Sequence, residues 1–329
     1  MDHQNGRRPT DLKTLRIEKN DAGQRLDKFL QKALDNMPYS LMYKLIRKKK
    51  IKVNRLRAEP GQTLNEGDEV LLFISDEFFG QRDTNDYSHT DTDLDIVYED
   101  KEIILVNKAP GVIVHSDDKN DSGTLIDRVK AYLIKNKEYD PQSENSFAPS
   151  LCNRIDRNTG GIVIAAKTAA ALRIMNEKIK NGEITKRYLL VCHGSFEKKS
   201  GRYKNFLLKD GDANTVRVFD RPVPDGRTAI TDYRVLKEKD GLSLVEATLG
   251  TGRTHQIRAQ FAYYGHPLLG DGKYGINRGD RKKGFSHQAL WSYKVRFDFK
   301  SDAGELAYLA GKEFEVNEKK IPFTSMFSC

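Results

Sequence analysis

Asp156 is a single carboxylate between two arginines, Arg154 and Arg157, in the segment that spans residues 153–161. A Thr-Gly-Gly turn follows this aspartate, and the apolar run at residues 162–166 predicts a buried strand. The carboxylate is therefore expected to lie in a turn that a rigid strand holds in place. An ionised aspartate can act as a nucleophile or as a base. An aspartate flanked by arginines in a loop is more often a surface ion pair of little energetic value, and the residues alone leave both interpretations open.

The chain is long and highly charged. Its 329 residues suffice for two or three domains, and 56 basic against 47 acidic residues give a net charge of +9. This balance favours a polyanionic partner, and nucleic acid is the first candidate. No apolar run approaches the roughly 20 residues that a membrane-spanning helix needs, and no apolar segment of a secretory signal follows the N-terminus. We therefore expect a cytoplasmic protein without a membrane partner.

The three cysteines, Cys152, Cys192 and Cys329, are widely separated and form no C-x-x-C pair, which argues against both a disulfide framework and a zinc site. His255 and His266 are eleven residues apart and have no further ligands at metal spacing. The glycine-rich turn before His255 lacks the G-K-S/T of a phosphate-binding P-loop. We therefore expect neither a metal nor a cofactor.

The first domain is predicted at residues 14–75. Residues 1–75 contain 16 lysines and arginines against 10 acidic residues, so most of the excess positive charge lies in the first quarter of the chain. Apolar residues at helical spacing predict two helices, the second capped by Ser40. Cations follow on the outer face of the second helix and just beyond it, at Lys44, Arg47, Lys48, Lys49, Lys50 and Lys52. An isolated run of this kind is usually a solvated surface.

The runs R-L-D-K-F-L, M-Y-K-L-I-R-K-K-K-I-K-V-N and G-Q-T-L-N-E-G-D-E-V of this segment resemble the S4-type RNA-binding domain. In that family the second helix and the following strand lie against the RNA backbone. The resemblance implies salt-dependent, largely sequence-independent binding of phosphates by four cations, Lys44, Arg47, Lys48 and Lys52. Residues 76–93 are polar and weakly periodic and are predicted to be a linker, which leaves residues 94–329 for a second domain.

Three motifs lie in this second domain. Around Asp156 the chain reads N-R-I-D-R-N-T-G-G, and residues 107–115 read N-K-A-P-G-V-I-V-H. The third motif comprises the runs G-R-T-H-Q-I-R and G-H-P-L-L-G-D. Together they resemble the RluA-type pseudouridine synthases, whose central motif is H-R-L-D-R-x-T-S-G. The chain departs from that pattern at Asn153, Gly160 and, in the first motif, Ala109, whereas the third motif agrees at almost every position.

The resemblance implies a role for each matching residue. Asp156 would be the catalytic aspartate, and Arg258 would form a salt bridge with it. Tyr188, which is a core residue in most strands of this kind, would stack on the base that leaves the RNA helix. Arg154 would insert where that base had been. The remaining residues of the predicted binding site are Arg157, Arg253 and His255.

The fold implied by the resemblance is α+β, with a small S4-type N-terminal domain and a catalytic domain on a mixed, largely antiparallel β-sheet. Thr254 is expected to cap the helix that carries Arg258. Asn153 removes an ionisable neighbour from the motif, and Gly160 should loosen its turn slightly. We expect activity to survive both departures, because the scheme needs no imidazole at position 153.

These observations predict an RNA pseudouridine synthase that acts as a monomer on large-subunit (23S) ribosomal RNA. Transfer RNA is an alternative substrate. Two hypotheses from other classes are a non-catalytic RNA-binding factor for ribosome assembly and a metal-dependent RNA hydrolase. Whether Asp156 attacks the sugar or the base stays open at this point.

Overall fold

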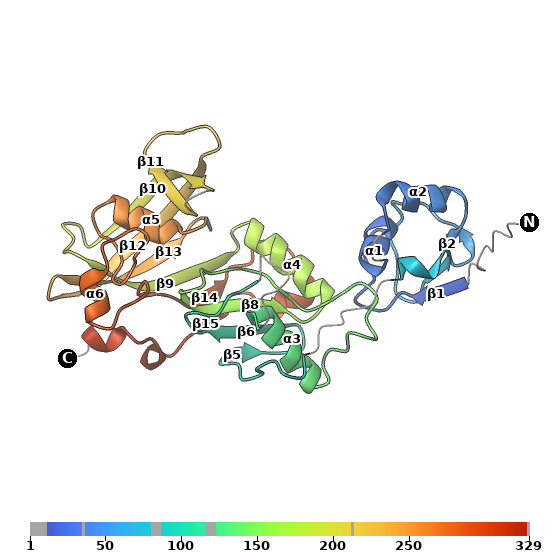
Figure 1. Cartoon of the computed structure of the whole chain (residues 1–329), viewed down its shortest axis with the longest axis horizontal. Coiled ribbons are helices and arrows are strands. Elements are labelled where there is room, and N and C mark those ends of the chain that lie inside the picture. The colour runs from blue at the N-terminus through green and yellow to red at the C-terminus, as the bar shows by residue number, and fades with distance from the viewer. Residues whose placement is uncertain (1–11, 35–36, 80–86, 116–122, 212–213, 328–329) are drawn as a thin grey trace, which may run out of the picture. The chain divides into compact units, whose positions relative to one another are not determined.

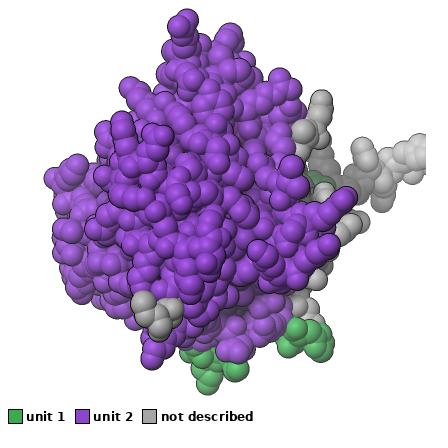
Figure 2. Space-filling model, turned by 90° about the vertical axis from the view of Figure 1, so that its left-hand side faces the viewer, with its two compact units in different colours: residues 1–89, 133–149, 167–170 green, residues 90–132, 150–166, 171–329 purple. Residues whose placement is uncertain are grey.

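The computed structural model describes residues 12–34, 37–79, 87–115, 123–211 and 214–327, and Figure 1 shows the course of the chain. Two compact units are present (Figure 2). Unit 1 comprises residues 1–89, 133–149 and 167–170, and unit 2 comprises residues 90–132, 150–166 and 171–329. Among the helices of the described ranges, none is long and apolar enough to cross a membrane.

Unit 1 is built on a four-stranded antiparallel sheet with the order β1-β4-β2-β3. Its elements are β1 (Leu12–Arg16), α1 (Leu26–Ala33), α2 (Tyr39–Arg47), β2 (Ile51–Val53), β3 (Leu56–Arg57), β4 (Glu69–Phe73) and the 3-10 helix η1 (Asp76–Phe78). Apolar side chains at helical spacing, such as Phe29 and Leu30, are fully buried in the core of this unit. Helix α2 begins at Tyr39 with Pro38 at its N-cap position, so the prediction that Ser40 caps it is wrong. The fixed φ of proline suits the start of a helix.

A loop from the middle of the chain is anchored on unit 1 by Asp21. This aspartate is fully buried. Its carboxylate accepts hydrogen bonds from Asn145 Nδ2 at 2.8 Å and from Ser146 Oγ at 2.6 Å. Unit 1 therefore includes residues 133–149, which lie within the predicted second domain. The predicted boundaries at residues 75 and 94 stay predictions.

Unit 2 contains an eleven-stranded sheet with the order β11-β10-β12-β13-β9-β14-β8-β6-β5, in which β15 also pairs with β14 and β7 with β8. The strands are β5 (Ile96–Glu99), β6 (Ile103–Lys108), β7 (Ser150–Leu151), β8 (Gly160–Ala166), β9 (Ile184–His193), β10 (Ser200–Asp210), β11 (Thr215–Phe219), β12 (Arg227–Lys239), β13 (Leu242–Leu249), β14 (Leu290–Phe297) and β15 (Glu313–Glu315). The helices in or continuous with unit 2 are α3 (Leu125–Lys135), α4 (Ala169–Lys180), α5 (Gln256–Tyr263), α6 (Arg278–Lys282), η2 (Gly304–Leu309), η3 (Glu318–Lys320) and η4 (Thr324–Phe327).

Within the described part of this sheet, β8 and β14 are the one parallel pair. Their register sets Trp291 opposite Gly160 and Ser292 opposite Gly161. The expected α+β class and the mixed, largely antiparallel sheet are thus confirmed. Strand β8 is buried along its whole length, which provides the rigid support expected beside Asp156.

Two of the cysteines, Cys152 and Cys192, are free thiols. Burial raises the pKa of Cys152 to about 12, so its thiol stays protonated near neutral pH. Cys329 lies outside the described residues.

Candidate active site

Asp156 lies in a tight turn between β7 and β8. Its carbonyl oxygen accepts a hydrogen bond from the Thr159 backbone N–H at 3.0 Å, which closes the turn directly before the sheet begins. The side chain of Asn153 supports the same segment, because its Oδ1 accepts from the Ile164 N–H at 2.8 Å. An amide can accept this bond without carrying charge. The carboxylate of Asp156 is one quarter exposed and therefore open to a ligand.

Arg258 reaches this carboxylate from helix α5. Its Nη1 donates to Asp156 Oδ2 at 2.8 Å, while its Nε and Nη2 donate to the two oxygens of Asp271 at 2.7 and 2.9 Å. Burial lowers the pKa of Arg258, but the two carboxylates outweigh it and hold the pKa above its ordinary value. The guanidinium is thus a fixed, permanently charged fork that orients Asp156.

His255 approaches the same oxygen of this carboxylate as Arg258 does, with Nε2 at 3.9 Å from Asp156 Oδ2. Burial lowers the pKa of His255, the charge of Asp156 raises it and that of Arg258 lowers it, with a net decrease. The imidazole is therefore neutral at pH 7. Its Nδ1 lies 2.9 Å from the Tyr274 hydroxyl, and burial raises the pKa of Tyr274 to about 12. The protonated hydroxyl of Tyr274 can thus donate to Nδ1, which leaves the imidazole N–H on the nitrogen that faces Asp156.

Helix α5 begins with an unusual residue. His255 occupies its N-cap position in the left-handed region, at φ 52° and ψ 19°, and no side chain caps the helix. The prediction that Thr254 caps this helix is therefore wrong. Left-handed backbone is uncommon for residues other than glycine. Here it aims the imidazole at the carboxylate, and such backbone is typical of functional sites.

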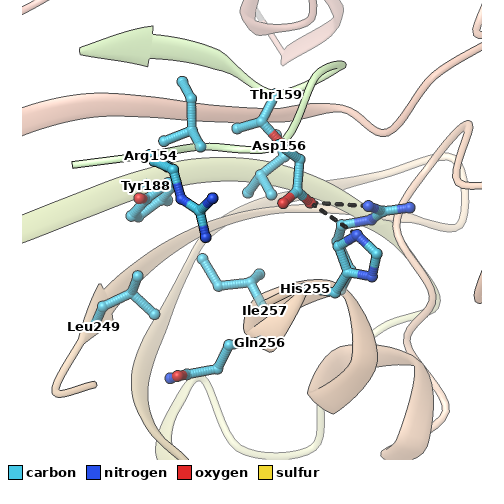
Figure 3. A pocket seen from close by; sticks show the side chains of 11 residues that line it. Arg154, Asp156, Thr159, Tyr188, Leu249, His255, Gln256 and Ile257 are labelled. Atoms are coloured by element: carbon cyan, nitrogen blue, oxygen red, sulfur yellow. Dashed lines mark hydrogen bonds and ion pairs between the residues drawn. The ribbon is translucent and has the colours of Figure 1, made fainter. Parts of the chain in front are cut away.

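A cavity of about 60 Å³ lies beside Asp156. Its lining consists of Arg154, Ile155, Asp156, Thr159, Tyr188, Leu249, His255, Gln256, Ile257, Arg258 and Leu290. Apolar and charged side chains both line it, with His255 directed at Asp156 and Arg154 next to Tyr188, as Figure 3 shows. A pocket of this composition suits a planar, partly polar ring with one edge directed at the carboxylate.

Tyr188 projects from β9 into this cavity and is 6% exposed. Burial raises its pKa to about 12, so the phenol stays protonated at neutral pH. Arg154 is exposed, and its side chain extends into the pocket toward Ile257 (Figure 3). Within the described part of the chain no ion pair restrains Arg154, which leaves its cation available to a ligand.

A family model described as RNA pseudouridylate synthase matches residues 102–263. An uncharacterized RNA pseudouridine synthase of Mycoplasma genitalium is 33% identical over 290 residues, which are 85% of this chain and 88% of the relative. The chain belongs to the RNA pseudouridine synthase family. It is accordingly an isomerase with RNA as its substrate, and the expected family and enzyme class are confirmed.

Two further comparisons agree with this assignment. A ribosomal large subunit pseudouridine synthase C of Vibrio cholerae is 30% identical over 302 residues, which are 90% of this chain and 91% of the relative. The solved structure of human RNA pseudouridylate synthase domain containing 1 has a TM-score of 0.52 and 21% identity, and the match covers 72% of this chain and 96% of that one. This structural likeness shows a shared fold.

In this pseudouridine synthase, the predicted site residues fall into three groups. Asp156, Tyr188, Arg258, Arg154 and His255 line one pocket. Two other predicted residues, Arg157 and Arg253, are absent from that lining. Arg157 Nε donates to the Gly111 carbonyl at 3.1 Å, and Arg253 Nε donates to the Thr228 carbonyl at 3.2 Å. The cations Lys44, Arg47, Lys48 and Lys52 belong to unit 1.

Sequence reasoning assigned no role to Lys108, which is 1% exposed. Its Nζ donates to three backbone carbonyls, those of Ala109, Val112 and Arg157, at 3.0, 3.0 and 2.8 Å. Burial lowers the pKa of Lys108 to about 8, while the charge of Asp156 raises it. This lysine therefore ties the loop at residues 109–112 to the turn that carries Asp156. The position of Lys108 in the N-K-A-P-G run of the first motif was the one feature of the sequence that could have indicated this role.

Asp271, Tyr274 and Gln256 also had no predicted role. Asp271 holds Arg258, and Tyr274 holds His255. The side chain of Gln256 accepts from Thr251 Oγ1 at 2.8 Å and donates to the Ile230 carbonyl at 2.9 Å, which fixes the start of α5 on the sheet. All three stand in or beside the quoted third motif. Asp271 and Tyr274 bond to residues of the same motif, whereas the Ile230 carbonyl that Gln256 reaches lies on strand β12.

The glycine at position 160 has a packing reason. A Cβ on Gly160 would lie 2.4 Å from the ring of Trp291, well inside van der Waals contact. Trp291 is 5% exposed, and its Nε1 donates to Asn107 Oδ1 at 3.0 Å. We expected Gly160 to loosen the turn slightly. The structure instead shows that the Trp291 indole packs so closely on Gly160 that it leaves no room for a side chain at this position.

Proposed function

We propose that this enzyme isomerises uridine to pseudouridine in large-subunit ribosomal RNA, with Asp156 as its catalytic carboxylate. The observation that carries the catalytic assignment is the 2.8 Å hydrogen bond from Arg258 to Asp156. This bond lies in a pocket that apolar side chains also line. The substrate is supported by relatives named ribosomal large subunit pseudouridine synthase C.

The reaction exchanges one bond for another. The bond between ribose C1′ and uracil N1 breaks, a bond between C1′ and C5 forms, the proton leaves C5, and N1 gains a proton. The atoms balance without an oxidant, a reductant or a second substrate. The protein must therefore supply an ionised carboxylate, a pocket that holds the detached ring and groups that keep the RNA open.

The pocket residues divide these tasks. Arg258 fixes the orientation of the Asp156 carboxylate, and its charge favours the ionised form. The ring of Tyr188 offers a stacking surface, and because its phenol is protonated it adds no second anion to the site. Removing a base from an RNA helix costs a few kcal/mol. The unrestrained cation of Arg154 is suited to occupy the space that the base leaves in the polyanionic duplex.

Unit 1 would add RNA affinity. Lys44, Arg47 and Lys48 are exposed on or beside α2, and Lys52 follows on β2. We assign this unit to the S4-type RNA-binding domains on the sequence resemblance, and its helices and sheet are compatible with backbone contacts of this kind.

The test is carbodiimide-adduct primer extension across ribosomal and transfer RNA. Three strains are compared, which carry the wild-type gene, a deletion, or Asp156→Asn. Stops in large-subunit RNA that vanish in both the deletion and the Asp156→Asn strain support the proposal and identify the uridines. If stops are lost only in transfer RNA, the substrate is transfer RNA and not ribosomal RNA. Unchanged stops in the Asp156→Asn strain would overturn the catalytic role of Asp156 and favour a role in ribosome assembly instead.

A further inference from the structure

Helix α2 of unit 1 carries an exposed pair of aromatic side chains. Tyr39 and Tyr43 are 52% and 39% exposed, and their rings are stacked with centroids 6.5 Å apart and an interplanar angle of 28°. Residues four apart lie on one face of a helix, so Arg47 continues the same row. Single exposed tyrosines are ordinary, whereas two adjacent rings in line with a cation form a surface with a defined chemistry.

The two rings are held in place from below. The Tyr43 hydroxyl donates to Asp27 Oδ2 at 2.9 Å. Arg25 binds the same carboxylate through two hydrogen bonds, from Nε to Asp27 Oδ1 at 3.1 Å and from Nη2 to Oδ2 at 2.7 Å. Lys28 Nζ lies 5.9 Å from the centroid of the Tyr39 ring. A ligand that stacks here therefore meets rings that have already lost much of their rotational freedom.

The charge beside the rings is positive. Lys44, Arg47 and Lys48 are exposed, and none of the three forms an ion pair with any residue that the structure describes. The Asp27 carboxylate, which anchors Tyr43, is 2% exposed and already paired with Arg25. The surface thus offers aromatic faces next to cations that have no carboxylate partner among the described residues.

We propose that Tyr39 and Tyr43 form a stacking platform for an unpaired RNA base, with the neighbouring cations binding the phosphates of the same strand. Stacking on tyrosine tolerates any base, because every base has a flat π-face, and paired bases within a duplex present no such face to a protein. The platform selects substrates with a single-stranded segment beside a helix, beyond the non-specific attraction of the cations. This inference rests on the proposed RNA-binding role of unit 1.

The test measures binding of the full-length protein to two RNAs by fluorescence anisotropy over a series of salt concentrations. One RNA is a closed hairpin, and the other is the same hairpin with a five-nucleotide uridine tail. The variants are Tyr39→Ala, Tyr39→Phe and Lys44→Ala, with Leu56→Ala as a matched control. Leu56 is an apolar residue on β3 of the same unit and is 71% exposed.

Wild type, Tyr39→Phe and Leu56→Ala are expected to prefer the tailed RNA. Tyr39→Ala should weaken binding to the tailed RNA roughly tenfold, leave the hairpin affinity unchanged and keep the salt slope, because stacking releases no counterions. Lys44→Ala should weaken binding to both RNAs and reduce the salt slope by about one. A Tyr39→Trp variant adds a direct signal, since its fluorescence should be quenched by the tailed RNA but not by the hairpin.

The outcomes separate the two proposals. If Lys44→Ala loses affinity while Tyr39→Ala binds both RNAs like wild type, the platform is overturned and the RNA-binding role of unit 1 stands. If neither substitution changes RNA binding, both the stacking platform and the RNA-binding role of unit 1 are overturned. A wild-type protein that shows no preference for the tailed RNA also contradicts the platform.

Discussion

Arg258 holds Asp156 through a single nitrogen, Nη1, at 2.8 Å. Its other two nitrogens, Nε and Nη2, donate to the carboxylate of Asp271 at 2.7 and 2.9 Å. The position of the Asp156 carboxylate, the proposed catalytic group, therefore depends on a second carboxylate that also binds Arg258. Asp271 is buried, and burial raises its pKa, but the hydrogen bonds and charge of Arg258 outweigh this and hold the pKa below its ordinary value.

The first prediction concerns Asp271→Asn. The amide keeps the shape of the side chain but removes one charge-assisted acceptor, so the fork of Arg258 loses its orientation. We expect kcat to fall about 100-fold, as a displacement of about 1 Å can cause, with KM for RNA nearly unchanged. Steady-state assays measure both. The control is Asp210→Asn, which removes a half-buried carboxylate paired with Arg217 at 3.2 Å and should leave kcat at the wild-type value. A wild-type kcat for Asp271→Asn would contradict the positioning role.

The second prediction concerns the packing of Trp291 on Gly160. Gly160→Ser should destabilise the fold by about 1–3 kcal/mol, because the new side chain collides with the indole. In a Trp291→Leu background the same change should cost much less, although Trp291→Leu is itself destabilising. Urea unfolding of the four proteins in this cycle gives the coupling energy. Additive effects would show that the indole does not restrict position 160.

The central motifs were sufficient to predict five residues of one pocket. Asp156, Arg154, Tyr188, Arg258 and His255 lie in three segments, and the family pattern supplied what spacing alone could not. The pattern gave no information on contacts between segments that are distant in sequence. For this reason the indole above Gly160 was unforeseen, and so was the shell of carbonyls that encloses Lys108.

Local rules failed where tertiary contacts decide the conformation. A threonine at position 254 is a favoured helix cap, yet His255 occupies the N-cap position in left-handed backbone, with its imidazole 3.9 Å from the Asp156 carboxylate. The role of Arg157 in RNA binding stays a prediction, and the hydrogen bond from its Nε to the Gly111 carbonyl is a tertiary contact that spacing did not predict. The strand predicted at residues 162–166 is confirmed as part of β8, because a continuous apolar run depends on burial, which the sequence records directly.

The third prediction concerns pH. Below about pH 8 Lys108 is an ammonium that satisfies three carbonyls, and above its pKa of about 8 it keeps only two protons to donate. Activity should therefore decline as pH rises through 8, because the catalytic turn loses one anchor. The decline is not caused by unfolding. The pKa of Lys108 is about 8 in the folded protein, against an ordinary value of 10.5. Between these two pH values the lysine is protonated in the unfolded chain but largely neutral in the folded one. Lys108 therefore makes the fold more stable as pH rises through this range.

Rate profiles and urea unfolding between pH 7 and pH 9.5 separate these two effects. Lys108→Met retains the alkyl stem but removes the Nζ donor from the carbonyls of Ala109 and Val112, whereas the Arg157 carbonyl keeps the Gly111 N–H at 2.9 Å. We expect a loss of about 3 kcal/mol of stability. Whatever activity Lys108→Met retains should be insensitive to pH in this window. An alkaline decline that persists in Lys108→Met would assign the titration to another group.

The fourth prediction concerns the buried polar chain beneath helix α5. Thr231 Oγ1 accepts from Gln256 Nε2 at 2.9 Å and donates to Gln260 Oε1 at 2.7 Å. Gln260 Nε2 continues the chain to Asn205 Oδ1 at 2.8 Å. Because the two glutamines flank Arg258 on the helix, this chain sets the rotation of the residue that holds Asp156.

Thr231→Val is nearly isosteric and leaves two glutamine groups partly unsatisfied, so the free energy of unfolding should fall by about 2 kcal/mol. The loss of rotational restraint on α5 should lower kcat about tenfold, with RNA affinity unchanged. Thr248→Val is the control, since Thr248 is half-buried on the adjacent strand β13 and donates no recorded side-chain hydrogen bond within the described residues. If Thr231→Val destabilises the protein but retains the wild-type kcat, the polar chain stabilises the fold without positioning Arg258. If only kcat falls, its effect is confined to the site.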